Sequence, residues 1–177
     1  MYFCLPRTRL VSLTATLIAM FTLVAAPAAL AQTAVYSGVT TAVVNASTNS
    51  NITNPQAVAV DAHGNVFVAD GGSSIFAYEV LAGTGGAAPG TVNTKSKCVP
   101  IGSGLFYATG IAVDTLGNVY VADNSGYLYE FVAGTNGAAA GVVNQQSQVI
   151  ILGSGTFSNP AGVAVDSHGN VFVADIF

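Results

Sequence analysis

The chain has 177 residues, of which 51% are hydrophobic and only 7% are charged, and it contains 20 glycines. This composition is too apolar for a disordered chain and too rich in glycine for a helical bundle, so it predicts a packed β-protein of about one domain. Its only basic residues are Arg7, Arg9, Lys95 and Lys97. Because nucleic-acid binding needs clustered positive charge, the sequence argues against a nucleic-acid partner.

The N-terminal 31 residues have the features of a secretory signal. Arg7 and Arg9 precede an apolar stretch, residues 10–24, and small residues then lead to Ala29-Leu30-Ala31. A basic region, an apolar region and an A-x-A site predict a signal peptide over 1–31 that is cleaved after Ala31, with export to the periplasm, the cell envelope or the medium. The alternative is an uncleaved anchor, because residues 10–31 carry no charge and about 20 such residues span a bilayer. After cleavage we expect no stable membrane insertion.

The segment that follows, residues 32–53, is interpreted as an N-terminal strand and linker, with the strand within 33–45. Signal cleavage would remove Cys4 and leave Cys98 as the sole cysteine. A single thiol cannot form a disulfide within the chain, so we expect Cys98 to be a small apolar strand residue, with an intermolecular bridge as the alternative. No CxxC or Cys/His cluster is present, which argues against structural zinc.

A repeat organises the rest of the chain. Three segments, 54–70, 107–123 and 159–175, read NPQAVAVDAHGNVFVAD, YATGIAVDTLGNVYVAD and NPAGVAVDSHGNVFVAD. The spacing of these segments gives a unit of about 52 residues. The predicted units are 54–106, 107–158 and a partial third unit, 159–177.

Each unit contains the signals for four antiparallel strands. In the first unit we expect strands at 57–60, 65–69, 75–81 and 94–101, and in the second unit the last two fall at 127–132 and 146–152. Asp61 to Gly64 predicts a tight hairpin turn, because an aspartate accepts backbone hydrogen bonds and Gly64 adopts positive φ without steric cost. Gly117 and Gly169 should do the same.

The strands of the repeat are apolar at every position. Residues 66–69 read VFVA and residues 119–122 read VYVA. A half-exposed strand alternates apolar and polar residues, so this pattern predicts that both faces of each sheet are buried. Four-stranded sheets stacked face to face every 40 to 50 residues form a β-propeller. A β-solenoid is the alternative, but its coils are usually shorter.

The repeated string, G-[IV]-A-V-D-x-x-G-N-[VI]-[YF]-V-A-D, resembles the NHL repeat. The resemblance covers residues 54–177 and implies an all-β fold of propeller blades with four antiparallel strands each. About two and a half blades are present, so we expect an incomplete ring, a truncated product or fragment, and self-association through the open blade faces. Self-assembly of copies into a ring is the alternative. The family also implies binding at the faces of the ring, and some of its enzymes, lyases and sugar lactonases, use a metal in the central channel.

The carboxylates of this chain are repeated rather than unique. Each of them occupies a position that is repeated in successive units, or nearly so for the two glutamates: Asp61, Asp70, Glu79, Asp114, Asp123, Glu130, Asp166 and Asp175. A catalytic pair needs two carboxylates in different environments, whereas a residue copied into each blade is more simply a turn cap. Calcium binding is the rival interpretation, although each turn offers few oxygens. His63 and His168 are expected as exposed turn residues, because Leu116 replaces them in the second unit.

The sequence accordingly predicts no catalytic, cofactor-binding or metal-binding residue and no cofactor. It favours an exported non-catalytic binding or scaffold module that contacts a protein or glycan through loops at a propeller face. The alternative is a propeller enzyme of lyase or lactonase type, with its channel metal and site residues outside this chain; a third possibility is an envelope spacer. Two lysines and eight carboxylates give the mature chain a formal charge of −6, which disfavours anionic ligands.

Overall fold

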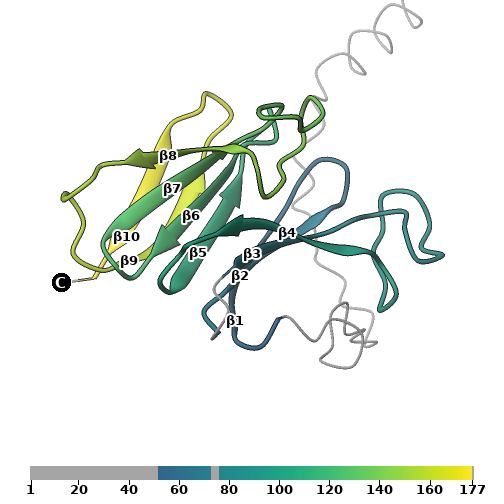
Figure 1. Ribbon diagram of the computed structural model, residues 1–177, viewed down its shortest axis with the longest axis horizontal. Helices are drawn as coiled ribbons and strands as arrows, with labels where there is room; N and C mark the ends of the chain where they lie inside the picture. Colours follow the sequence, from purple (N-terminus) through teal and green to yellow (C-terminus); the bar gives the residue numbers. More distant parts are fainter. Residues whose placement is uncertain (1–51, 73–75, 177) are drawn as a thin grey trace, which may run out of the picture. The chain divides into compact units, whose positions relative to one another are not determined.

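The computed structural model describes residues 52–72 and 76–176 (Figure 1). The predicted signal peptide, most of the predicted linker and its extra strand lie outside these residues, so those interpretations stay predictions. Ten strands and no helix occur in the described part of the chain. It follows that no described helix is long and apolar enough to span a membrane.

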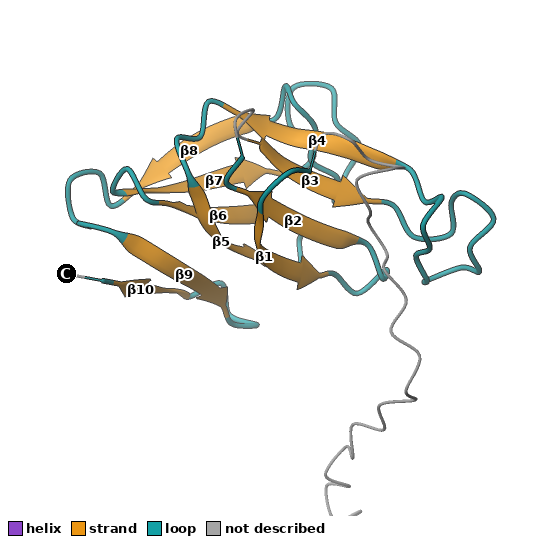
Figure 2. Cartoon of the chain, turned by 90° about the horizontal axis from the view of Figure 1, so that it is seen from below, coloured by secondary structure: helices purple, strands orange, loops and turns teal. Residues whose placement is uncertain are grey.

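The ten strands form two four-stranded sheets and one hairpin (Figures 1 and 2). We call these blade 1, blade 2 and the blade 3 hairpin; each is antiparallel, with neighbouring strands consecutive in sequence. Blade 1 contains β1 (Pro55–Val60), β2 (Val66–Asp70), β3 (Phe76–Val80) and β4 (Cys98–Ser103). Blade 2 contains β5 (Ala108–Val113), β6 (Val119–Asp123), β7 (Tyr127–Val132) and β8 (Gln148–Leu152), and the hairpin contains β9 (Pro160–Val165) and β10 (Val171–Asp175). The predicted all-β arrangement of two and a half propeller blades without ring closure is confirmed.

One set of strand boundaries was predicted wrongly. The fourth strand of blade 1 begins at Cys98 rather than Thr94, and that of blade 2 begins at Gln148 rather than Gln146. The residues before each strand form a turn, in which the Ser96 N–H donates to the Asn93 carbonyl (3.1 Å) and the Lys95 N–H to Asn93 Oδ1 (2.7 Å). An asparagine that bonds its own backbone competes with the strand ladder, and this delays the start of β4.

The sheets pack face to face, and the largest apolar core lies between blade 1 and blade 2. Phe67, Ala69 and Ala77 from blade 1 meet side chains of blade 2 such as Val119 and Phe131. A second cluster, which includes Tyr120 and Leu128, packs against the blade 3 hairpin. Every residue of β6 is buried, as its apolar sequence predicted, because blade 2 has a neighbour on both sides.

Phe172 departs from the expectation that both faces of each sheet are buried. Phe67 and Tyr120 are 3% and 5% exposed, whereas Phe172, in a strand of the same sequence as β2, is 58% exposed. The reason is position: one face of the hairpin packs on blade 2, and no described residue covers the other. Identical strands therefore differ in burial because their neighbours differ.

Gly110 sets how closely β5 and β9 approach. A Cβ added to Gly110 would lie 2.9 Å from the Gly162 Cα, closer than real Cβ contacts allow. The Thr109 hydroxyl, in the adjacent residue, donates to the Pro160 carbonyl at 2.6 Å and so joins the two blades. Gly110 thus permits the close packing of neighbouring inner strands.

Gly110→Ala should lower the free energy of unfolding by about 1 to 3 kcal/mol, because the new methyl group forces β5 and β9 apart. Gly162→Ala is the matched control, since its Cβ would meet only the Ala174 Cβ, at 3.8 Å; it should change stability by less than about 1 kcal/mol. Urea denaturation followed by circular dichroism measures both. Equal losses for the two variants would contradict the close-approach role of Gly110.

Cys98, in β4, is the free cysteine of the described residues. It lies beside the cluster of Val68 and Tyr78, as expected for a small apolar strand residue. Burial raises the pKa of its thiol to about 11. Because the thiolate is the reactive form, the fold makes this thiol a poor nucleophile at neutral pH.

Candidate ligand pocket at the hairpin turns

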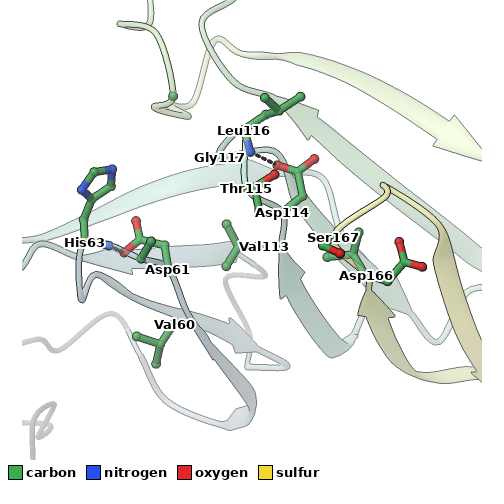
Figure 3. Close-up of a pocket in the computed structure, with 13 residues that line it drawn as sticks. Val60, Asp61, His63, Val113, Asp114, Thr115, Leu116, Gly117, Asp166 and Ser167 are labelled. Atoms are coloured by element: carbon green, nitrogen blue, oxygen red, sulfur yellow. Dashed lines mark hydrogen bonds between the residues drawn. The ribbon is translucent and has the colours of Figure 1, made fainter. Parts of the chain in front are cut away.

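The first turn of each repeat lies at the same end of its blade, and the three turns enclose a pocket of about 310 Å³ (Figure 3). The turns follow the innermost strands β1, β5 and β9, which run side by side. Val60, Val113 and Val165 end these strands and form the apolar part of the pocket. The propeller arrangement thus brings together residues that are about 50 positions apart in sequence.

Each of these turns is held by an aspartate, as the sequence predicted. Asp61 Oδ1 accepts the N–H groups of His63 (2.9 Å) and Asn65 (2.8 Å), and the Asn65 amide donates to Asp61 Oδ2 at 2.8 Å. Asn65 Oδ1 in turn accepts the Ala82 N–H at 2.9 Å, which ties the turn to the loop after β3. The side chains of the Asp-x-x-Gly-Asn motif therefore satisfy backbone donors that the hairpin leaves free.

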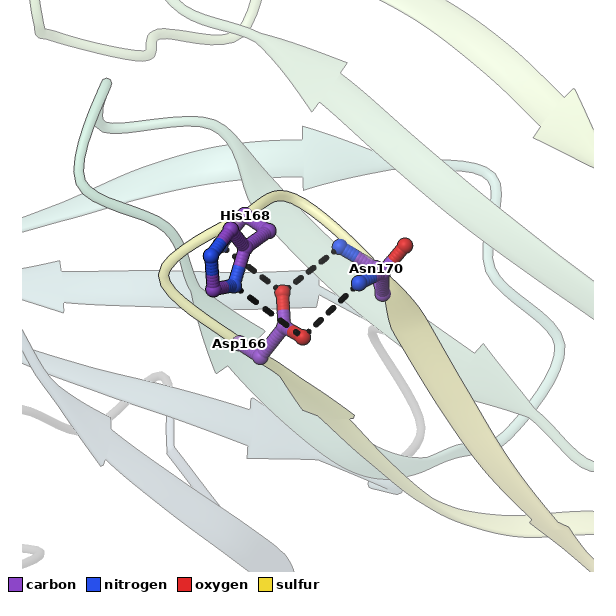
Figure 4. Close-up of polar contacts among 3 residues, drawn as sticks. All are labelled: Asp166, His168 and Asn170. Carbon is purple, nitrogen blue, oxygen red and sulfur yellow. Dashed lines mark hydrogen bonds and ion pairs between the residues drawn. The ribbon is translucent and has the colours of Figure 1, made fainter.

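The second and third turns repeat this geometry. Asp114 accepts the Leu116 and Asn118 N–H groups at 2.8 and 2.9 Å. Asp166 accepts the corresponding groups of His168 and Asn170 at 2.8 and 2.9 Å (Figure 4). Hydrogen bonds from Asn170 are the main cause that lowers the pKa of Asp166. These bonds account for the three pocket aspartates as turn caps, the role that the repetition indicated.

The two histidines differ in their relation to the pocket. His63 lines it, whereas His168 does not, and the His168 imidazole is 83% exposed, with Nδ1 3.8 Å from Asp166 Oδ2. Both are exposed turn residues, as predicted. Among the described residues, no group of three His, Cys, Asp or Glu side chains is arranged to hold a metal ion.

Because their side chains hold no strand in place, replacing His63 and His168 with Gln should change the free energy of unfolding by less than about 0.5 kcal/mol. Thermal unfolding by circular dichroism measures the change. A loss of more than about 1 kcal/mol would show that an imidazole has a structural role.

The second aspartate of each repeat stands outside the pocket. Asp70, Asp123 and Asp175 end the second strand of their blades and accept N–H groups from the segment that precedes the first strand, for example Tyr107 to Asp123 (3.1 Å) and Asn159 to Asp175 (2.6 Å). Asp70 and Asp123 are fully buried. These carboxylates therefore connect the end of the second strand of each blade to the segment that leads into the first strand.

Other pocket residues were missed by sequence reasoning. Ala62, Thr115 and Ser167 occupy one equivalent turn position, and all three line the pocket; so do His63 and Leu116 at the next position. A signal for them exists, because they vary between repeats while the Asp, Gly and Asn of the same turn do not. The constant aspartates hold the turns and also line the pocket, and the variable residues add side chains that differ from one repeat to the next.

The comparisons with known proteins agree with the repeat. A family model described as NHL repeat matches residues 157–177, which contain the third copy of the motif. No curated protein matches the chain significantly.

Among solved structures, one match is the PQQ-bound form of aldose sugar dehydrogenase from Streptomyces coelicolor. It is 17% identical with a TM-score of 0.40, and the alignment covers 68% of this chain and 36% of that one. The chain thus spans about a third of the length of this structure. The chain thus contains an NHL repeat at residues 157–177, and two further copies of the same motif, residues 54–70 and 107–123, lie at the equivalent strands of blades 1 and 2.

Proposed function

We propose that the chain is an exported, non-catalytic binding module whose contact surface includes the pocket at the hairpin turns. The observation that carries this proposal is that each turn combines constant residues, which fix its backbone, with variable residues at the pocket. Constant Asp, Gly and Asn residues fix the backbone, and the variable residues Ala62, Thr115 and Ser167 line the pocket beside the constant aspartates. Binding sites commonly combine such a rigid scaffold with variable loop side chains.

The chemistry of the pocket favours a neutral or cationic ligand. Its walls contain the carboxylates Asp61, Asp114 and Asp166, hydroxyl groups from Thr115 and Ser167, and no lysine or arginine. Apolar surface from the three valines at the strand ends completes it. A neutral glycan or a basic segment of a protein fits these walls better than an anionic ligand does.

The non-catalytic part of the proposal is supported by the hydrogen bonds of the carboxylates. Each pocket aspartate accepts two backbone N–H groups and one asparagine amide from its own turn. All three therefore share the same turn-capping bonds, to which the Tyr120 hydroxyl adds one at Asp114 and the His168 imidazole a contact at Asp166. Turn capping accounts for the repetition of these carboxylates, whereas acid–base catalysis uses a pair with distinct protonation states.

Binding is tested with the purified full chain on an array of neutral and charged glycans and of Lys/Arg-rich peptides. We expect saturable binding to neutral glycans or basic peptides and its loss in Ser167→Arg, which places a bulky charged side chain in the pocket. Ser154→Arg is the control, because Ser154 is exposed and lies outside the pocket. Absence of binding, or equal binding by the two variants, would contradict the proposal.

Export rests on the N-terminal sequence. Expression of the full chain in a bacterial host should yield an extracytoplasmic product that begins at Gln32, as measured by mass spectrometry. A product that retains the N-terminal 31 residues would contradict cleavage.

A further inference from the structure

Glu79 is a buried carboxyl group with an unpartnered oxygen. The residue lies in β3 and is 4% exposed, and its Oε2 atom is buried without a hydrogen-bond partner. A buried charge without a partner is strongly unfavourable, whereas a neutral carboxyl group is tolerated at lower cost. Glu79 therefore differs from the aspartates of the repeat, which accept hydrogen bonds.

The position of Glu79 places it in the packing between blades 1 and 2. It pairs across the sheet with Phe67, and Ala77 precedes it by two residues on the same face of β3. Phe67 and Ala77 belong to the core cluster that includes Ile111, Val119 and Phe131 of blade 2. On its other side Glu79 pairs with Val99 of β4, so both cross-strand neighbours are apolar.

In the second repeat, a hydroxyl group that the first repeat lacks lies beside the equivalent glutamate. Glu130 is the equivalent of Glu79, and Tyr120 is the equivalent of Phe67; the pairs have the same register. The Tyr120 hydroxyl lies 3.2 Å from both Glu130 Oε1 and Asp114 Oδ2, so it connects the strand glutamate with the turn aspartate. Phe67 has no hydroxyl, and the first repeat lacks this connection.

No described charged group near Glu79 offsets the cost of burying a negative charge there. Asp61, at the turn that follows β1, raises its pKa further because the two like charges repel. Asp70 lies at the far end of β2 and accepts N–H groups of Thr53 and Asn54, while Cys98 of β4 belongs to the cluster on the opposite face. In blade 2, β5 contacts β1 and β2 and contains no titratable side chain, and Asp114 beyond it caps its own turn. Tyr129 of β7 packs against the shared core cluster, and burial raises the pKa of its hydroxyl, which stays neutral near pH 7.

We infer that Glu79 makes the packing of blade 1 on blade 2 dependent on pH: the neutral carboxyl group is compatible with the closed interface, and the carboxylate weakens it. Burial is the main cause that raises the pKa of Glu79 from 4.5 to about 7. The folded state then holds one more proton than the unfolded state between these values. The free energy of unfolding therefore falls as the pH rises from about 4.5 to about 7, and the loss is complete above that range.

The first test measures the protonation of Glu79 directly. Glu79 and Glu130 are the only glutamates of the chain, so labelling with ¹³C at the side-chain carboxyl of glutamate gives two signals from the full chain. The signal that disappears in Glu79→Gln should titrate with a midpoint near pH 7. A midpoint below pH 5 for that signal would overturn the inference.

The second test measures the consequence for stability. Thermal unfolding of the parent chain and of Glu79→Gln is followed between pH 5 and pH 8.5, and the difference in Tm between the two should change in favour of Glu79→Gln as the pH rises. The histidines and the other carboxylates titrate in both proteins, so they cancel in this difference. A difference in Tm that is constant with pH would contradict the inference.

Phe67→Tyr and Glu130→Gln complete the design. Phe67→Tyr offers Glu79 the hydroxyl that Tyr120 offers Glu130, and a hydrogen bond to the carboxylate favours the charged form; the titration midpoint of Glu79 should move to lower pH. Glu130→Gln is the matched control in blade 2 and should leave the midpoint of Glu79 unchanged. An unchanged midpoint in a folded Phe67→Tyr chain would show that the missing hydroxyl does not matter.

Discussion

Asp123→Ala should lower the free energy of unfolding by at least about 3 kcal/mol. The Asp123 carboxylate is fully buried and accepts four hydrogen bonds, from the N–H groups of Phe106 (2.5 Å), Tyr107 (3.1 Å) and Ser125 (2.8 Å) and from the Ser125 hydroxyl. Removing it breaks four hydrogen bonds to a buried carboxylate and leaves partly buried donors without an acceptor, each of which costs about 1 to 3 kcal/mol. Urea denaturation followed by far-UV circular dichroism measures the loss, since the chain contains no tryptophan for fluorescence.

The equivalent residue of the blade 3 hairpin provides the control. Asp175 accepts two backbone N–H groups, at 3.0 Å from Ser158 and 2.6 Å from Asn159, and it is only partly buried. Water can replace the lost acceptor there, so Asp175→Ala should cost less than half as much. If both variants lost the same free energy, burial would not be the reason for the importance of Asp123.

Gly117→Ala should cost about 2 to 4 kcal/mol, for two separate reasons. Gly117 has φ of +86°, a conformation that side chains disfavour by about 1 kcal/mol or more. In addition, the new Cβ would lie 2.3 Å from the Gly141 carbonyl oxygen, so the loop between β7 and β8 must move. Thermal unfolding of the variant measures the combined cost.

Gly169→Ala separates the two contributions. Gly169 occupies the same turn position with φ of +81°, and no atom lies within 4 Å of its added Cβ. Its variant therefore has only the conformational cost, and Gly117→Ala should be less stable than Gly169→Ala by about 1 kcal/mol or more. If the two variants lost the same free energy of unfolding, the loop that contains Gly141 would move aside at no cost, and the contact with it would not contribute.

The candidate site was only partly accessible from the sequence. Repetition of Asp61, Asp114 and Asp166 indicated turn caps, and the hydrogen bonds confirm that role. Repetition alone does not indicate that the three turns line one pocket. That Ala62, Thr115 and Ser167 meet at one pocket depends on the alignment of β1, β5 and β9, which no spacing within a single repeat specifies.

The local sequence of one repeat specifies the unit of structure. A 52-residue period, a glycine at each Asp-x-x-Gly-Asn turn and fully apolar strands predicted four-stranded blades that bury both faces, because these signals act over short distances along the chain. The blade boundaries followed, apart from the start of the fourth strands.

Contacts between repeats, in contrast, make copies of the unit differ in burial and hydrogen bonding. The sequence VFVAD occurs in β2 and β10, yet Phe67 is buried and Phe172 is exposed, since burial depends on the neighbouring blade. Likewise Glu79 and Glu130 are the same residue at the same register, but Glu130 lies beside the Tyr120 hydroxyl, whereas Glu79 lies across from Phe67 and has a buried oxygen without a hydrogen-bond partner. Burial and hydrogen bonding arise from contacts between units, so identical local sequences acquire different energies when those contacts differ.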